Sequence, residues 1–112
     1  MYIGEAAKKT GLSIKAIRFY EDIGLIKSPK RVGRYRVYQE TEIELLVLIK
    51  EAKALGATLS QLKGVIVYSN GNVDWANIKV FLTEMRGQLL LQVDELMSKI
   101  ANLDKCYAQI NP

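Results

Sequence analysis

The chain has no histidine and only one cysteine, Cys106, among its 112 residues. Histidine and cysteine supply most ligands of tightly held zinc and copper, so we expect no metal site, and no other motif calls for a cofactor. One cysteine also cannot form a disulfide within the chain. The sequence has no nucleophile motif and no phosphate-binding glycine loop either, and it therefore predicts a protein that is not an enzyme.

Long apolar runs are also missing. No stretch approaches the ~18 consecutive apolar residues of a membrane-spanning helix. The first five residues lack the basic and apolar regions of a secretory signal. Apolar residues nevertheless make up 49% of the chain, which is enough to bury a core. These features predict a folded cytoplasmic protein without membrane contact, of a size that suits one domain plus one extended element.

Acidic residues are scarce in one part of the chain. Residues 8–38 contain nine Lys or Arg and two acids, a net charge of +7, whereas residues 39–112 contain seven basic and nine acidic residues, a net charge of −2. A basic patch confined to one module is the electrostatic feature expected of a nucleic-acid-binding protein. Charge alone leaves a solvated basic surface equally open, so the interpretation depends on the motif that carries the charge.

That motif is a pair of short helices joined by a tight turn. A first helix is expected over residues 3–10, and a glycine turn follows it. Ser13 predicts the start of the second helix, because its hydroxyl can accept hydrogen bonds from free amides of the first helical turn. Gly24 lies where a helix end favours a left-handed residue. This pattern is typical of a helix-turn-helix, whose second helix lies in the DNA major groove.

Residues 27–38 predict a small basic hairpin after this motif. Pro29 ends any helix, and Gly33 separates two short segments in which arginine alternates with β-branched or aromatic residues. A basic hairpin beside a helix-turn-helix is a wing, which contacts the phosphate backbone or an adjacent minor groove. Alternation is expected to place Arg34 and Arg36 on the outer face, and Tyr35 and Val37 on the other face.

Two helices and a turn are expected next. A Thr-to-Glu capping box at residues 41–44 predicts a helix over residues 42–55. A further helix is expected over residues 59–68, capped by Thr58 or Ser60. The string Ser-Asn-Gly-Asn at residues 69–72 predicts a turn.

Proline is absent from residues 73–110, and Gly87 is the one glycine there. This predicts one helix of up to about 38 residues, roughly 55 Å long. Its apolar residues recur mostly three and four apart, which is the seam of a coiled coil. The helix is too long to pack along its whole length against the rest of the chain, so we expect a second copy to cover it in antiparallel orientation. The alternative is a helix that packs back on its own domain. The expected dimerisation residues are Leu82, Met85, Leu89, Val93, Leu96, Ile100 and Leu103.

The sequence therefore predicts a mostly α fold. Residues 1–70 are expected to form a winged helix-turn-helix DNA-binding domain with a following helix pair. Residues 71–112 are expected to form the dimerisation helix of an antiparallel coiled coil.

Five strings of the chain are more specific than this general pattern. They are Ile3-Gly4-Glu5-Ala6-Ala7, Thr10-Gly11-Leu12-Ser13, Ala16-Ile17-Arg18-Phe19-Tyr20-Glu21, Gly24-Leu25-Ile26 and Tyr35-Arg36-Val37-Tyr38. With these strings the sequence resembles the MerR family of bacterial transcription regulators, and the resemblance covers every expected element.

The resemblance implies a homodimer that binds a pseudo-palindromic promoter in double-stranded DNA, distorts the DNA between the half-sites and lets RNA polymerase engage the promoter. It places Lys15 and Arg18 at the major groove and Tyr20 near a phosphate. From the residues alone, Arg18 can instead pair with Glu21 or Asp22, and Tyr20 can instead fill the seam between wing and helix. The full expected DNA-binding set is Ser13, Lys15, Arg18, Tyr20, Arg31, Arg34, Tyr35 and Arg36.

The chain departs from the metal-sensing members of the family, which resemble one another in carrying cysteines at the start of the dimerisation helix and in a loop after it. Residues 71–76 contain no cysteine or histidine, and the sequence ends about where that loop would begin. We therefore expect no metal binding, and a structural role for Cys106 in preference to a redox role. Either an effector segment is missing or the chain is a minimal member. An architectural or excisionase-like DNA-binding protein and a simple blocking repressor are the alternative functions.

Overall fold

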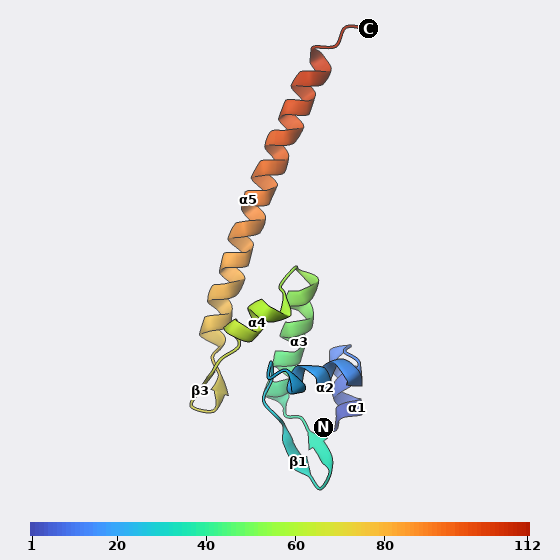
Figure 1. The fold of residues 1–112 in the computed structure, drawn as a ribbon, viewed down its shortest axis with the longest axis vertical. Coiled ribbons are helices and arrows are strands. Elements are labelled where there is room, and N and C mark those ends of the chain that lie inside the picture. The colour runs from blue at the N-terminus through green and yellow to red at the C-terminus, as the bar shows by residue number, and fades with distance from the viewer. The chain divides into compact units, whose positions relative to one another are not determined.

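The computed structural model describes residues 1–112, which divide into two compact units, Met1–Asp74 and Trp75–Pro112. The first unit, termed the head below, contains four helices and two small hairpins, and the second is one long helix (Figure 1). The predicted mostly α fold is therefore confirmed.

The head begins with the predicted helix-turn-helix. Helix α1 spans Ile3–Thr10 and helix α2 spans Ile14–Asp22. The buried Thr10 hydroxyl donates to the carbonyl of Ala6 at 2.8 Å and accepts from the backbone N–H of Leu12 at 3.2 Å. One side chain thus ties the end of α1 to the turn, which limits how α2 can leave it.

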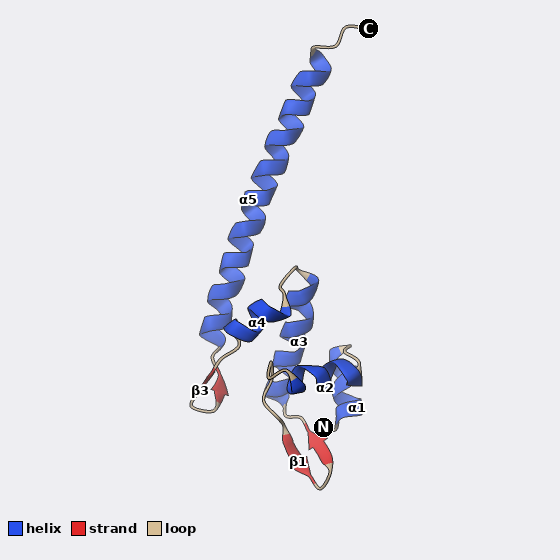
Figure 2. Cartoon of the chain, viewed as in Figure 1, coloured by secondary structure: helices blue, strands red, loops and turns tan.

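The predicted wing is also confirmed. Strands β1 (Lys30–Val32) and β2 (Tyr35–Val37) form an antiparallel hairpin (Figure 2). Their register places Arg31 directly opposite Arg36. The two-residue turn between them begins with Gly33 at φ +62°. A positive φ at the first turn position suits glycine and is what a tight hairpin with right-handed strand twist needs.

Helix α3 spans Glu40–Ala54 and begins two residues earlier than predicted. Its capping box is not the expected one at residues 41–44. The carboxylate of Glu42 instead accepts from the backbone N–H of Gln39 at 3.0 Å. The helix begins here because the chain leaves the wing at Tyr38, which is fixed in the core, and turns into α3 within one residue.

Helix α4 spans Leu59–Val65, and the expected cap is confirmed because Thr58 Oγ1 accepts from the backbone N–H of Gln61 at 3.1 Å. The helix is three residues shorter than predicted. Ile66 has extended backbone angles, and strand β3 begins two residues after it, at Tyr68.

A second small hairpin follows α4. Strands β3 (Tyr68–Ser69) and β4 (Asn72–Val73) pair antiparallel around Asn70 and Gly71, whose φ angles are +53° and +81°. Two consecutive positive φ angles define a type I′ turn, for which Asn-Gly is a preferred pair. The predicted turn at residues 69–72 is confirmed, whereas its two strands were not predicted.

The core of the head draws on every helix from α1 to α4 and on the ends of the wing. This packing fixes α2 and the base of the wing within one body, so the side chains on their outer surfaces have defined relative positions. The most deeply buried residues are Ala6, Ile17, Leu25, Tyr38, Leu45, Leu46, Ile49, Ala52 and Leu62.

The second unit is helix α5, which spans the 34 residues Trp75–Ala108. The predicted single long helix is confirmed, with two residues fewer at each end. Every residue from 86 to 112 is exposed in the single chain. Nothing in the chain covers the apolar seam over this distance.

Candidate nucleic-acid interface

The outer surface of α2 carries two unpaired basic side chains. Lys15 and Arg18 are both exposed, and neither forms an ion pair within the chain. The expected alternative, in which Arg18 pairs with Glu21 or Asp22, is therefore wrong. Ser13 begins the helix as predicted, since its Oγ accepts from the backbone N–H of Ala16 at 3.0 Å. The start of α2 thus presents a capped helix and two free positive charges.

The outer part of the wing is basic and aromatic. Arg31 on β1 and Arg34 in the turn are exposed and have no acidic partner, and the Tyr35 side chain is 63% exposed. The Tyr35 ring contacts the Tyr2 ring at a centroid distance of 5.8 Å, which steadies it without covering it. Three of the four expected wing residues are therefore available to a partner.

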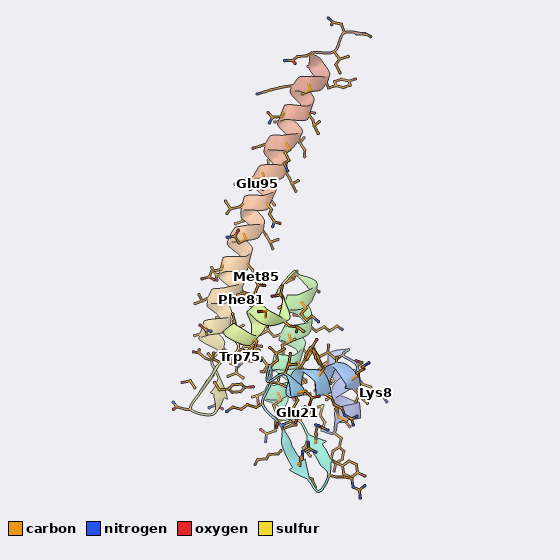
Figure 3. All side chains as sticks on the ribbon, viewed as in Figure 1. Lys8, Glu21, Trp75, Phe81, Met85 and Glu95 are labelled. Atoms are coloured by element: carbon orange, nitrogen blue, oxygen red, sulfur yellow. The ribbon has the colours of Figure 1, made fainter.

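Arg36 is the exception, and its expected place on the outer face with Arg34 is wrong. Its Nε donates to Oε2 of Glu21 at 2.6 Å, and the two side chains are only 19% and 7% exposed. Figure 3 shows Glu21 on α2, next to the hairpin that carries Arg36. The hydrogen bond to Glu21 raises the pKa of Arg36 above its ordinary value, so the Arg36 guanidinium keeps its positive charge.

Tyr20 lies on the inner side of α2. Only 4% of it is exposed, and its hydroxyl lies 3.4 Å from Nζ of Lys53 on α3. The burial supports the alternative in which Tyr20 fills space between elements of the head, and argues against the phosphate contact. Ile17, three residues earlier and on the same helical face, is also fully buried.

One of the two acids on α2, Glu21, is paired within the head, and this changes the electrostatics of the surface. Because Glu21 is both neutralised by Arg36 and withdrawn from solvent, its negative charge does not oppose an incoming phosphate. Four unpaired positive charges remain on α2 and the wing, against one exposed acid, Asp22; they are Lys15, Arg18, Arg31 and Arg34. This is a suitable surface for a polyanion, since phosphate neutralisation by such side chains supplies most of the affinity for DNA.

Comparison with known proteins gives the family. The family described as "MerR HTH family regulatory protein" matches residues 1–69. The chain belongs to the MerR family. A probable heavy metal-dependent transcriptional regulator of Haemophilus influenzae is 34% identical over 118 residues, covering all of this chain and 92% of that protein. The transcriptional regulator CueR of Yersinia pestis is 34% identical over 106 residues, covering 94% of this chain and 72% of that protein.

Solved MerR structures share the fold. The N-terminal part of the Bacillus subtilis multidrug transporter activator, MtaN, matches with a TM-score of 0.66 at 22% identity, covering 96% of this chain and 97% of that one. The MerR family regulator HiNmlR, described as lacking the sensor domain and bound to promoter DNA, matches with a TM-score of 0.57 at 21% identity, covering 96% of this chain and 78% of that one.

Membership of the MerR family makes this chain a transcription regulator and not an enzyme, as the sequence predicted. Within residues 1–112, no group of three or more Cys, Asp or Glu side chains is placed to hold a metal ion, and the expected lack of metal binding stays a prediction. None of the helices is long and apolar enough to cross a membrane.

Two contacts that shape this MerR head have no signal in the sequence. The Lys27 backbone N–H donates to the Tyr68 hydroxyl at 3.3 Å, and the Lys27 ammonium lies 4.3 Å from the centre of that ring. Tyr2, before α1, contacts the wing at Tyr35. Both contacts join residues more than 30 positions apart, so no local sequence pattern predicts them.

Proposed function

We propose that this MerR-family regulator binds double-stranded promoter DNA as a homodimer, with α2 in the major groove and the wing on the phosphate backbone. The observation that carries the proposal is the pair of exposed, unpaired basic residues on α2, Lys15 and Arg18, beside a wing with two more. The HiNmlR structure, described as bound to promoter DNA, supports the same use of this fold.

A binding measurement with R18A tests the DNA contact. We expect the parent protein to select a pseudo-palindromic sequence from random DNA, and R18A to bind that sequence more weakly by about 1–3 kcal/mol. The matched control is K105A, which removes one positive charge from the far end of α5 and should leave the affinity unchanged. Equal affinity of the parent and R18A would remove Arg18 from the interface.

The dimer is proposed from the seam on α5. Five seam residues are between 44% and 67% exposed in the single chain, namely Leu89, Val93, Leu96, Ile100 and Leu103. A regular apolar row of this kind on an uncovered helix is suited to a second copy of the same helix. Antiparallel pairing is proposed because it sets the two heads far apart, as two half-sites on one face of a duplex require.

Light scattering of L96D tests the dimer. The parent protein should have twice the chain mass of 12.6 kDa. Aspartate in the seam is an unpaired buried charge that costs several kcal/mol, so L96D should be monomeric and should lose tight DNA binding. The control S98D places the same charge two residues away on the opposite face of the helix, and it should remain dimeric. A monomeric, folded parent protein would refute the proposal.

We further propose that the dimer acts in the cytoplasm, distorts the promoter between the half-sites and thereby lets RNA polymerase engage it. We do not propose a metal as its signal, although the Haemophilus relative is named as heavy metal-dependent. The expected lack of metal binding is supported by the scarcity of metal-ligating side chains, because each subunit has one cysteine and no histidine. Equilibrium dialysis with Zn²⁺, Cu⁺ and Cd²⁺ should detect no stoichiometric binding to residues 1–112, and submicromolar binding would overturn this part.

A further inference from the structure

The wing is joined to the recognition helix by one ion pair. Glu21 lies in the last turn of α2, and Arg36 is the middle residue of β2. Their side chains meet at 2.6 Å and are largely shielded from solvent, with exposed fractions of 7% and 19%. A charged pair with this geometry and shielding constrains both elements more strongly than an exposed pair such as Lys9 with Glu40, which are 3.8 Å apart.

The wing also has an attachment on its other side. The bridge between Tyr2 and Val37 pairs the residue before α1 with β2, and the rings of Tyr2 and Tyr35 are in contact. A two-stranded hairpin is marginally stable by itself in water, so the position of this one depends on such attachments. The bridge holds the strand on the α1 side, and the ion pair with Glu21 holds it on the α2 side.

The register of the wing gives Glu21 a second effect. Arg31 and Arg36 are direct cross-strand partners, so their side chains lie on the same face of the hairpin. Like charges in this position repel and destabilise the pairing. Glu21 neutralises the charge of Arg36, so this repulsion is reduced. Arg31 then remains an unpaired cation at the surface without destabilising the pairing of β1 and β2.

We propose that Glu21 and Arg36 are positioning residues, which hold the wing at the orientation that lets α2 and the wing bind one DNA duplex together. The proposal rests on the proposed DNA-binding function. It also predicts an effect that is unusual for an acidic residue at a DNA-binding surface. Removing the negative charge of Glu21 should weaken DNA binding, whereas electrostatics alone predicts that it strengthens binding.

The first test uses E21Q with D22N as the matched control. Each variant removes one acid from the end of α2, and Asp22 is exposed and has no ion pair. We expect E21Q to bind the selected DNA at least about tenfold more weakly than the parent, a size typical of coupled contacting residues. D22N should bind equally well or more tightly. E21Q with unchanged or tighter binding would overturn the proposal.

A double-mutant cycle separates positioning from general destabilisation. In the parent, R34A should weaken binding and shallow the salt dependence, because the variant removes a phosphate contact of the wing. In E21Q the wing no longer reaches the backbone correctly, so adding R34A should change little. If E21Q only lowered the stability of the head, the two effects would multiply. Multiplicative losses would therefore contradict positioning, and R36K, which keeps the charge, should bind between the parent and E21Q.

A measurement without DNA decides the proposal independently of the proposed function. Spin labels on V32C in the wing and K15C in α2, in a C106S chain diluted with unlabelled protein, report the distance between the two elements. The distribution should be narrow in the parent and in D22N, and it should broaden in E21Q. An equally narrow distribution in E21Q would overturn the proposal whatever the DNA result. A broadened one, with no DNA binding by the parent, would refute only the proposed function.

Discussion

The ammonium of Lys53 lies 3.4 Å from the hydroxyl of Tyr20, joining helix α3 to the inner side of helix α2. The same ammonium lies 5.6 Å from the centre of the Tyr20 ring. Since Tyr20 is only 4% exposed, the contact gives its hydroxyl a partner inside the head. Tyr20 therefore stabilises α2 from the side of the helix that faces the interior of the head.

This contact predicts that Y20F keeps its affinity for DNA. The substitution removes one hydrogen bond to a charged group with an exposed side chain, so we expect the free energy of unfolding to fall by about 1 kcal/mol or less. Y20A removes a buried ring and should lose about 3–5 kcal/mol. Thermal unfolding and DNA binding are measured on the same preparations. A tenfold loss of DNA affinity in Y20F at unchanged stability would show that the hydroxyl holds a phosphate after all.

Tyr38 leads to a prediction of the opposite sign. Its hydroxyl is buried and has no hydrogen-bond partner, which is a cost to the folded state. Y38F removes that cost and leaves the ring in place, so the variant should be as stable as the parent or slightly more stable. A loss of more than about 1 kcal/mol in denaturant unfolding would reveal a partner for the hydroxyl.

The pH dependence of Y38F follows from the same burial. Desolvation raises the pKa of Tyr38 above its ordinary value, and the charge of Glu21 adds to the effect. A raised pKa in the folded state means that the unfolded chain loses this proton first, so stability falls as the pH rises above about 10. Phenylalanine at this position cannot ionise, and the stability difference between Y38F and the parent should grow between about pH 9 and about pH 11. A constant difference would contradict the raised pKa.

The sequence was sufficient for features that depend on local signals. Ser13 and Gly24 marked the two ends of α2, and the lack of proline between Val73 and Ile110 marked the long helix. The β3–β4 hairpin was not predicted but could have been, because Asn70-Gly71 is a strong signal for a type I′ turn.

The sequence was insufficient where a distant residue decided the outcome. Strand alternation placed Arg36 outward with Arg34, but the structure turns it toward Glu21, 15 positions earlier in the chain. The alternation itself holds within β2, but it does not determine which face of the strand points toward α2, and Arg34 lies in the turn before the strand. The contact between Arg36 and Glu21 also decided against an Arg18–Glu21 pair, which helical spacing alone permits.

The wing arginines provide a prediction about salt. R34A should weaken binding to the selected DNA and to random DNA by similar factors, because a phosphate contact carries no sequence information. The slope of log K against log salt should become shallower by about one unit for each phosphate interaction removed in each subunit. Titrations at several salt concentrations measure both effects. A weakening confined to the selected sequence would instead place Arg34 against a base.

The last prediction concerns the shape of the bound DNA. Each head presents α2 and a wing within one compact unit, and we propose that in the dimer the paired α5 helices hold two such heads at a fixed spacing. Both heads can then bind one duplex only if the duplex adopts their spacing and angle. Smooth bending of a 20–30 base-pair site costs on the order of 1–6 kcal/mol. A net charge of +7 over residues 8–38 in each subunit can offset this through phosphate contacts and counterion release.

We therefore expect the bound operator to be bent or untwisted. Donor and acceptor dyes on the two DNA ends should move closer on binding, and operators with phased A-tracts should show phase-dependent gel mobility. The control is the same DNA with one half-site scrambled, which can engage only one head and should keep the end-to-end distance of free DNA. If the distance and twist of the intact operator also match free DNA, the dimer does not distort its site. Such a protein would act by occupying the promoter, as a simple blocking repressor does.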